Sequence, residues 1–256
     1  MRILCVGDVV GRPGRDAVRA LLPGLRAELG IDLVIVNGEN AAGGAGLTSE
    51  VARELSQAGA DVITTGNHVW DQRRFVGEIS ALPTVLRPLN FPSAQPGRGW
   101  IIVRGALVVN AIGRVFMAQA DDPYRAMDDL LALLGPDAPA IRILDWHAEA
   151  TSEKIAMGWH LDGRFSAVVG THTHVPTADA RVLPQGTALV ADIGMVGPRD
   201  SVLGVAPEII VGRFRDGLPR RFEIPAGPVS FNSVLLDIDG GGRARSIERV
   251  DRVHPG

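Results

Sequence analysis

The stretch Leu33-Val34-Ile35-Val36-Asn37-Gly38-Glu39-Asn40 is a short aliphatic run that ends at a glycine with polar neighbours. Two further runs, Arg2–Val6 and Val62–Thr65, end in the same way, and we expect strands at all three, the middle one over Leu33–Val36. Patterns typical of helices separate them, at about Asp16–Leu29 and Glu50–Ala58. This alternation predicts βαβ units with parallel strands, and therefore an α/β fold.

The remainder of the chain is more mixed. A hairpin is predicted around Arg104-Gly105-Ala106, and Gly240-Gly241-Gly242 separates a second, closing pair of strands. No repeat, low-complexity segment or linker divides the sequence, so residues 1–256 are expected to form a single domain. The elements expected in this part are the strands Trp100–Val103, Leu107–Ala111, Ile141–Leu144, Ala167–Val169, Ala188–Ala191, Ser230–Asp237 and Arg243–Val250, and the helices Pro123–Leu134 and Ser152–His160.

Composition narrows the class of protein. The chain has 256 residues, a formal net charge of −3, six histidines and one cysteine, which leaves no internal disulfide and no cysteine-rich zinc site. The near-neutral charge argues against binding of nucleic acid through bulk positive charge. The apolar run at the N-terminus breaks at Gly7, short of a signal peptide or a membrane span, and we expect a cytoplasmic protein without membrane contact. Of the 26 basic residues 25 are arginine, and the single lysine, Lys154, predicts no function.

Polar side chains that could bind a metal follow five of the expected strands. Ligands of open α/β sheets bind beyond the carboxyl ends of the strands, so these side chains are expected to converge. Taken alone, each has an ordinary alternative: Asp8 as a turn cap, Gly38-Glu39-Asn40 as a solvated turn, His147 as a hydrogen-bonded structural histidine. Their combination predicts a metal site. The residues are Asp8, Glu39, Asn40, Asn67, His68, His147, His172 and His174.

The types of ligand indicate the metal and the chemistry. Imidazole with carboxylate and amide oxygens, and no thiolate, suits iron, manganese or zinc. Glu39 is a candidate bridge between two cations, which in two-metal sites polarise a phosphoryl oxygen and generate hydroxide from bound water at neutral pH. The residues therefore predict hydrolysis of a phosphoester.

The order of these residues resembles the calcineurin-like metallophosphoesterases. The variants Gly38-Glu39-Asn40-Ala41-Ala42-Gly43-Gly44 and Gly66-Asn67-His68-Val69-Trp70-Asp71 are similar to the YmdB-like bacterial branch of that family, and the resemblance runs from Met1 to about Val250. It implies a four-layer αββα sandwich with mixed sheets and a dinuclear centre at one edge.

The resemblance also implies a role for each residue. Two divalent or trivalent metal ions per chain, with iron expected and manganese or zinc as the other candidates, would share Glu39. His68 would be the general acid that protonates the departing ribose oxygen of a small phosphodiester substrate, with 2′,3′-cyclic nucleotides as the implied class. The implied ligands of one ion are Asp8, Glu39, Asn40 and His174, and those of the other are Glu39, Asn67, His147 and His172.

The sequence departs from the wider superfamily at two positions. Asp8-Val9-Val10 stands where Asp-x-His is usual, so one imidazole ligand is missing, and Asn40 is the proposed replacement. Val69 stands where an acidic residue usually follows the catalytic histidine, and Asp71 is a candidate to orient His68 instead. The segment Asp192–Pro198 also looks family-like; it either shapes the pocket or a subunit contact, or forms a tight structural turn.

Two other functions stay open at this point. One is a metal-containing regulator that binds a nucleotide, RNA or a protein with little turnover, and the other is a phosphomonoesterase or nuclease. Hydrolysis is favoured because His68 has no obvious purpose in a purely structural site. A homo-oligomer is expected.

Overall fold

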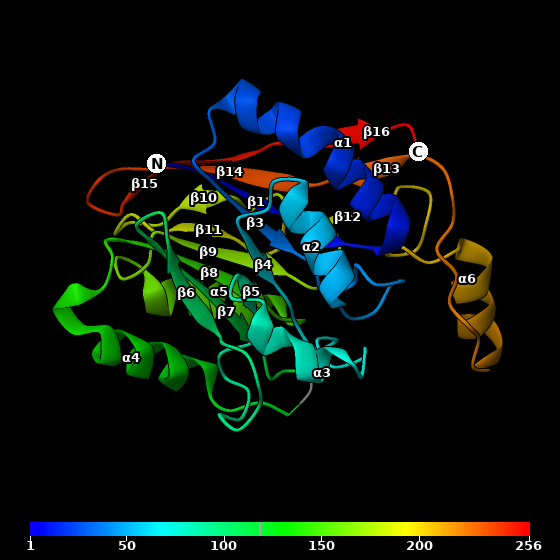
Figure 1. Cartoon of the computed structure of the whole chain (residues 1–256), viewed down its shortest axis with the longest axis horizontal. Coiled ribbons are helices and arrows are strands. Elements are labelled where there is room, and N and C mark those ends of the chain that lie inside the picture. The colour runs from blue at the N-terminus through cyan, green and yellow to red at the C-terminus, as the bar shows by residue number, and fades with distance from the viewer. Residues whose placement is uncertain (118) are drawn as a thin grey trace.

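Two six-stranded mixed sheets form the centre of the computed structural model, which describes residues 1–117 and 119–256 (Figure 1). The strands of the first sheet, in spatial order, are β15 (Ala244–Arg249), β14 (Ser233–Ile238), β1 (Arg2–Val6), β3 (Leu33–Asn37), β4 (Val62–Thr64) and β5 (Val85–Leu86). The strands of the second are β10 (Arg181–Val182), β11 (Ala188–Val190), β9 (Ala167–Thr171), β8 (Ile141–His147), β7 (Ala106–Ile112) and β6 (Trp100–Val103).

Shorter elements complete the fold. A four-stranded sheet has the order β16 (Arg252–His254), β13 (Val229–Phe231), β12 (Met195–Pro198) and β2 (Asp8–Val9). The helices are α1 (Gly11–Leu29), α2 (Ser49–Gln57), α3 (Phe75–Glu78), α4 (Pro123–Leu134), α5 (Thr151–Leu161) and α6 (Pro207–Asp216), with 3₁₀ turns η1 (Ile79–Ala81) and η2 (Gly135–Asp137). None of the helices in the described part of the chain combines the length and the hydropathy needed to span a bilayer.

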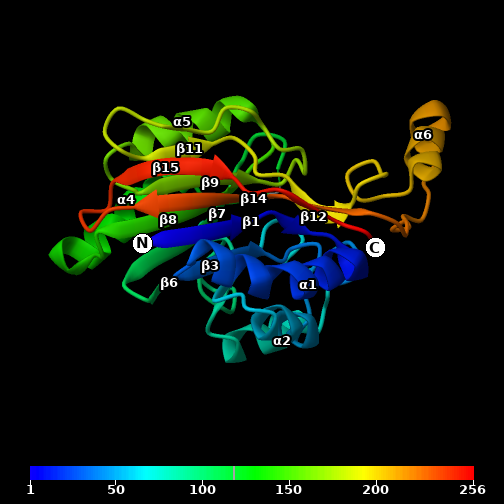
Figure 2. The same ribbon diagram turned by 90° about the horizontal axis from the view of Figure 1, so that it is seen from above.

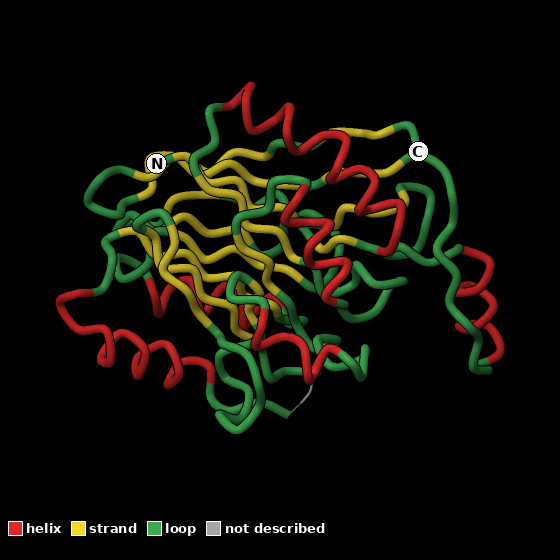
Figure 3. The backbone as a smooth tube through the Cα atoms, viewed as in Figure 1, coloured by secondary structure: helices red, strands yellow, loops and turns green. Residues whose placement is uncertain are grey.

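The alternation of side chains along the strands builds four layers. In β1, Leu4 and Val6 pack with residues of α1 and α2, whereas Ile3 and Cys5 face the second sheet. In the second sheet, Leu144 and its neighbours pack outward against α4 and α5. Figure 2 shows the order: α5 on one outer face, the two sheets in the middle, and α1 and α2 on the other outer face, and Figure 3 shows the strands gathered between the helices. The expected four-layer αββα sandwich with mixed sheets is confirmed.

The first third of the chain follows the prediction closely. The three expected strands, β1, β3 and β4, are parallel neighbours, and α2 is capped by the Thr48 side chain, which accepts a hydrogen bond from the Val51 backbone. The prediction that a helix begins at Asp16 is wrong, because α1 begins at Gly11. Pro13 lies in its first turn, where a missing backbone N–H leaves no helical hydrogen bond unmade.

Later elements differ more from the expectation. The strand expected to end at Leu144 continues to His147, and the one expected to end at Val169 continues to Thr171. These polar ends stay in the sheet because they bond to each other: the Thr171 hydroxyl donates to Asp145 Oδ1 over 2.6 Å. The strand expected over Ser230–Asp237 is divided at Asn232 into β13 and β14. The elements not predicted from the sequence are α3, α6, β2, β5, β10, β12, β16 and the 3₁₀ turns η1 and η2.

Candidate metal centre

The candidate metal-binding side chains meet at one edge of the sandwich, where the strands of both sheets end. Because β1, β3 and β4 are parallel to one another, as are β8 and β9, their carboxyl ends lie side by side. The short strand β2 follows β1 and contributes Asp8, and β8 contributes its last residue, His147. Loops after β3, β4 and β9 contribute Glu39, Asn40, Asn67, His68, His172 and His174.

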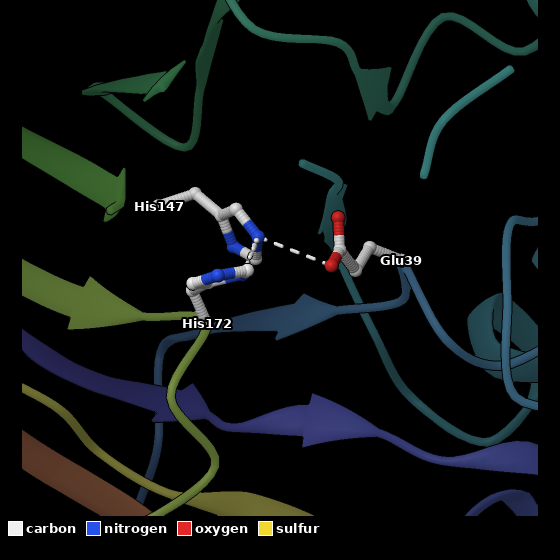
Figure 4. Close-up of side chains that lie close together, drawn as sticks. All are labelled: Glu39, His147 and His172. Atoms are coloured by element: carbon white, nitrogen blue, oxygen red, sulfur yellow. Dashed lines mark hydrogen bonds and ion pairs between the residues drawn. The ribbon is translucent and has the colours of Figure 1, made fainter. Parts of the chain in front are cut away.

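One cluster centres on His147 (Figure 4). Its Nε2 lies 3.1 Å from Glu39 Oε1, 3.2 Å from Asn67 Oδ1 and 3.0 Å from His172 Nδ1. Glu39, His147 and His172 each offer a ligand atom within 4.8 Å of the others. Four side chains from four different segments therefore direct donor atoms to one point.

A second cluster adjoins the first through Glu39. His174 Nε2 lies 3.9 Å from Asp8 Oδ1 and 3.1 Å from Asn40 Nδ2, and Asn40 Nδ2 is 3.5 Å from Glu39 Oε1. A half-turn of the Asn40 amide exchanges its nitrogen for its oxygen without moving the backbone, and so presents a ligand atom to the same point. The structure thus brings all seven residues expected as metal ligands together at this edge of the sandwich.

The partners of His147 determine which of its nitrogens faces the cluster. Nδ1 lies 2.9 Å from the Thr171 hydroxyl, which already donates its proton to Asp145 Oδ1. The hydroxyl oxygen must then accept from Nδ1–H, so Nε2 is the nitrogen turned towards Glu39. Asp145 is 5% exposed, and burial raises the pKa of its carboxyl.

The other two cluster histidines are fixed in the same manner. His172 Nε2 lies 3.1 Å from Glu149 Oε2, and His174 Nδ1 lies 3.0 Å from the Leu203 carbonyl oxygen. Each therefore has an outward nitrogen next to an oxygen acceptor and an inward nitrogen facing the clusters, the arrangement that orients histidine ligands in metal sites.

Sequence reasoning missed these supporting groups. Asp145 stands two residues before His147 in β8, and residues two apart along a strand share a face, so this spacing was the available signal for Asp145. Glu149 lies beyond the end of β8, where this pattern does not apply. The Leu203 carbonyl gave no signal, because any residue carries one.

The charges of the cluster favour a cation. Burial would raise the pKa of Glu39, but His147 beside it holds that pKa well below its ordinary value. Burial would likewise lower the pKa of His147, and Glu39 raises it instead. Burial and the neighbouring His147 lower the pKa of His172 to about 3, so this imidazole keeps a free lone pair at neutral pH. A bound cation would replace the proton that His147 and Glu39 otherwise share.

Two further observations fit a metal. Asp8 Oδ1 is buried and has no hydrogen-bond partner among the described residues, a costly state for a carboxylate unless a cation neutralises it. At Gly66, a Cβ would lie 2.2 Å from Glu39 Oε2 and 2.3 Å from His147 Nε2. Only glycine leaves this space between ligand atoms open.

His68 lies at the rim of the centre. Its backbone N–H donates to Glu39 Oε2 over 3.3 Å, and its ring Nδ1 lies 2.8 Å from Asp71 Oδ2. The side chain is 39% exposed, so Nε2 is accessible to a bound molecule. The contact with Asp71, which the sequence offered only as a candidate, is present. Arg12, also near the motifs in sequence, is 83% exposed and pairs with Asp16 instead.

The fold and this donor set define the class of protein. A four-layer αββα sandwich with carboxylate, amide and imidazole groups at the carboxyl ends of its strands is the arrangement expected of the calcineurin-like metallophosphoesterases. Within that class, the profile of the family described as "YmdB-like protein" matches residues 4–250. The chain belongs to the YmdB-like family.

The similarity to known proteins covers nearly the whole chain. The chain is 48% identical over 255 residues to a Bacillus subtilis protein named 2′,3′-cyclic-nucleotide 2′-phosphodiesterase, with 98% of this chain and 96% of the relative covered. A solved structure of a hypothetical protein from Thermus thermophilus is 43% identical, with a TM-score of 0.93 and all of both chains covered. A Mycoplasma pneumoniae structure described as a novel phosphatase is 31% identical, with a TM-score of 0.93 and 100% and 94% covered.

Proposed function

We propose that the protein is a metal-dependent phosphodiesterase that hydrolyses small phosphodiesters, with 2′,3′-cyclic nucleotides as the substrate class. The observation that carries the proposal is the pair of donor clusters that share the buried Glu39. The name of the Bacillus subtilis relative supports the substrate class.

The roles proposed for the ligands follow from the two clusters. One cation would be held by Asp8, Glu39, Asn40 and His174, and the other by Glu39, Asn67, His147 and His172. When bound, such ions supply Lewis-acid polarisation of the phosphoryl group and an activated water. Iron is proposed, with manganese or zinc as the other candidates, because the donors are nitrogen and oxygen without a thiolate.

His68 is proposed as the general acid. The ribose oxygen that leaves on cleavage of a cyclic phosphodiester is a poor leaving group until it is protonated. With Nδ1 bonded to Asp71, the ring presents Nε2 as the atom that donates the proton. The contact with the Asp71 carboxylate fixes the orientation of the ring.

A panel of substrates tests the function. Metal-loaded protein is expected to hydrolyse 2′,3′-cyclic nucleotides faster than 3′,5′-cyclic nucleotides, linear diesters and phosphomonoesters. A preference for monoesters or for nucleic-acid strands would favour the phosphatase or nuclease alternative. If fully metal-loaded protein hydrolyses none of them, the alternative of a regulator that binds nucleotide, RNA or protein is correct.

The homo-oligomer expected from the sequence is proposed to form through α6, which stands away from the sheets (Figures 1 and 2). All residues of this helix are described and none is buried; Phe214 is 84% and Val211 is 51% exposed. A helix of this length is marginal in water on its own, and its Arg213 packs over the Phe222 ring of the segment that follows it. Glu208 and Arg215 lie at opposite ends of the same exposed stripe, so an antiparallel pairing with a second copy would place Glu208 against Arg215 of the partner subunit.

Light scattering of the purified protein tests this pairing. Phe214→Asp is expected to reduce the wild-type mass to that of one chain. Leu133→Asp serves as the control, since Leu133 is 75% exposed but lies on α4. An unchanged mass for Phe214→Asp, or a monomeric wild type, would refute the proposed pairing through α6.

We further propose that residues 1–256 act as one domain and that the protein is cytoplasmic. The cytoplasmic location is supported by the single cysteine, Cys5, which is buried in β1.

A further inference from the structure

One buried ion pair behind the metal centre has no part in the function described so far. Lys154 is 2% exposed on α5, and its Nζ lies 2.6 Å from Asp192 Oδ2, which follows β11 and is 1% exposed. The chain uses arginine at 25 of its 26 basic positions, and this buried position holds its only lysine. Lysine carries a compact ammonium and arginine a broad, planar guanidinium, so the two are not interchangeable in a buried ion pair.

Asp192 binds the loop that carries two of the proposed ligands. Besides Lys154, its Oδ2 accepts hydrogen bonds from the backbone N–H of Thr173 over 3.0 Å and from the Thr173 hydroxyl over 2.8 Å. Thr173 stands between His172 and His174, so both bonds act at the centre of the His-x-His loop.

This loop needs such support because its backbone is strained. His172 has a φ of 100° and His174 a φ of 64°, a region that residues with a Cβ rarely adopt. Conformations of this kind persist only where surrounding contacts enforce them. The two bonds from Thr173 to Asp192 hold the residue between the two strained positions.

The other oxygen of the same carboxylate reaches the opposite side of the centre. Asp192 Oδ1 accepts from the Gly194 backbone N–H over 2.8 Å, and the Gly194 carbonyl accepts from the Asp8 backbone N–H over 3.2 Å. Gly194 has a φ of 88°, and a Cβ on the neighbouring Gly7 would lie 2.0 Å from its carbonyl oxygen. One carboxylate therefore joins the His-x-His loop to the turn against which Asp8 lies.

We infer that Lys154 and Asp192 are positioning residues that hold His172, His174 and Asp8 in the geometry that binds the two metal ions. Lys154 supplies the charge that lets the buried carboxylate of Asp192 accept four hydrogen bonds, and Asp192 fixes the loop and the turn. The segment Asp192–Pro198 thereby acquires a role in the site. This inference rests on the proposed metal centre.

The test compares metal retention in the purified, metal-loaded protein. Metal content per chain is measured by mass spectrometry, and the rate of loss of Mn²⁺ to an excess of chelator is followed over time. Asp192→Asn and Lys154→Met are expected to lose Mn²⁺ about tenfold to a hundredfold faster than wild type, as is typical when a group that orients ligands is removed.

Asp162→Asn is the matched control. Asp162 is 6% exposed and accepts hydrogen bonds from the backbone N–H groups of Gln185 and Thr187, but Thr187 precedes β11 whereas Asp192 follows it. Asp162→Asn therefore also removes a buried carboxylate, but one that lies at the opposite end of β11 from Asp192. Metal retention in this variant is expected to equal that of wild type.

The double variant Lys154→Met with Asp192→Asn separates positioning from folding. Since neither charge is left buried without its partner, its thermal stability is expected to exceed that of either single variant, while Mn²⁺ is still lost faster. Wild-type metal retention in the double variant, or equally fast loss from Asp162→Asn, would overturn the inference alone. A wild-type protein that binds no metal would overturn the proposed function as well.

Discussion

Replacement of His68 by alanine separates acid catalysis from metal binding. General acids typically contribute about 10²–10⁴-fold to a rate, so kcat for a 2′,3′-cyclic nucleotide is expected to fall by that factor. The ring of His68 contacts Asp71 rather than the clusters, so metal content is expected to stay at the wild-type level. For a p-nitrophenyl diester, whose leaving group departs without protonation, the loss is expected to be much smaller.

The exposure of the His68 and Asp71 pair limits the effect of Asp71→Asn. The side chains are 39% and 46% exposed, and exposed pairs of this kind are worth up to about 1 kcal/mol, or roughly fivefold in rate. Steady-state kinetics on both substrates, with metal analysis of each variant, provide the measurement. An equal loss on the p-nitrophenyl diester, or loss of metal with His68→Ala, would refute the role of general acid.

Three further changes test other parts of the site and the fold. Glu39→Gln is expected to lower the metal content of both clusters, and two fully occupied ions in this variant would exclude the bridge. Gly66→Ala places a methyl group between the ligand atoms and is expected to abolish metal binding, whereas Gly77→Ala, which meets no atom within 4 Å, leaves metal content unchanged. Burial would raise the pKa of Asp251, but the Arg249 guanidinium lowers it below its ordinary value. This carboxylate therefore stabilises the fold above its unfolded pKa and loses that contribution as pH falls through its folded pKa. Asp251→Asn should accordingly lower Tm at neutral pH and leave Tm unchanged in strong acid. An equal loss of Tm at both pH values would contradict the lowered pKa of Asp251.

The sequence predicted the fold best where an apolar run of strand length is followed directly by a glycine-containing turn. The runs at Arg2–Val6 and Leu33–Val36 form strands because each is short, β-branched or aliphatic, and ended by glycine, and the two strands are parallel neighbours because a helix connects them. It failed at α6, whose apolar residues form no buried stripe, and at Asn232, where one apparent strand divides between two sheets. Both depend on contacts between distant segments, which a local pattern does not contain.

The candidate site was predictable to the extent that strand ends predict convergence. The histidines and carboxylates were visible as polar residues after apolar runs, and the structure brings them together. The groups that orient these ligands were not visible in the sequence. The bond from Thr173 to Asp192 joins residues 19 positions apart, and the bond from Lys154 to Asp192 joins residues 38 positions apart. Such pairs become visible only when the second sheet is assembled.

Whether two cations share Glu39 is tested most directly by anomalous diffraction from crystals of the metal-loaded protein, measured on both sides of the absorption edge of the bound metal. Two peaks are predicted, separated by about 3.5–4 Å as in other two-metal sites. One should lie among Asp8, Asn40 and His174, and the other among Asn67, His147 and His172, with a Glu39 oxygen between them. A single peak, or peaks outside these two clusters, would contradict the dinuclear centre.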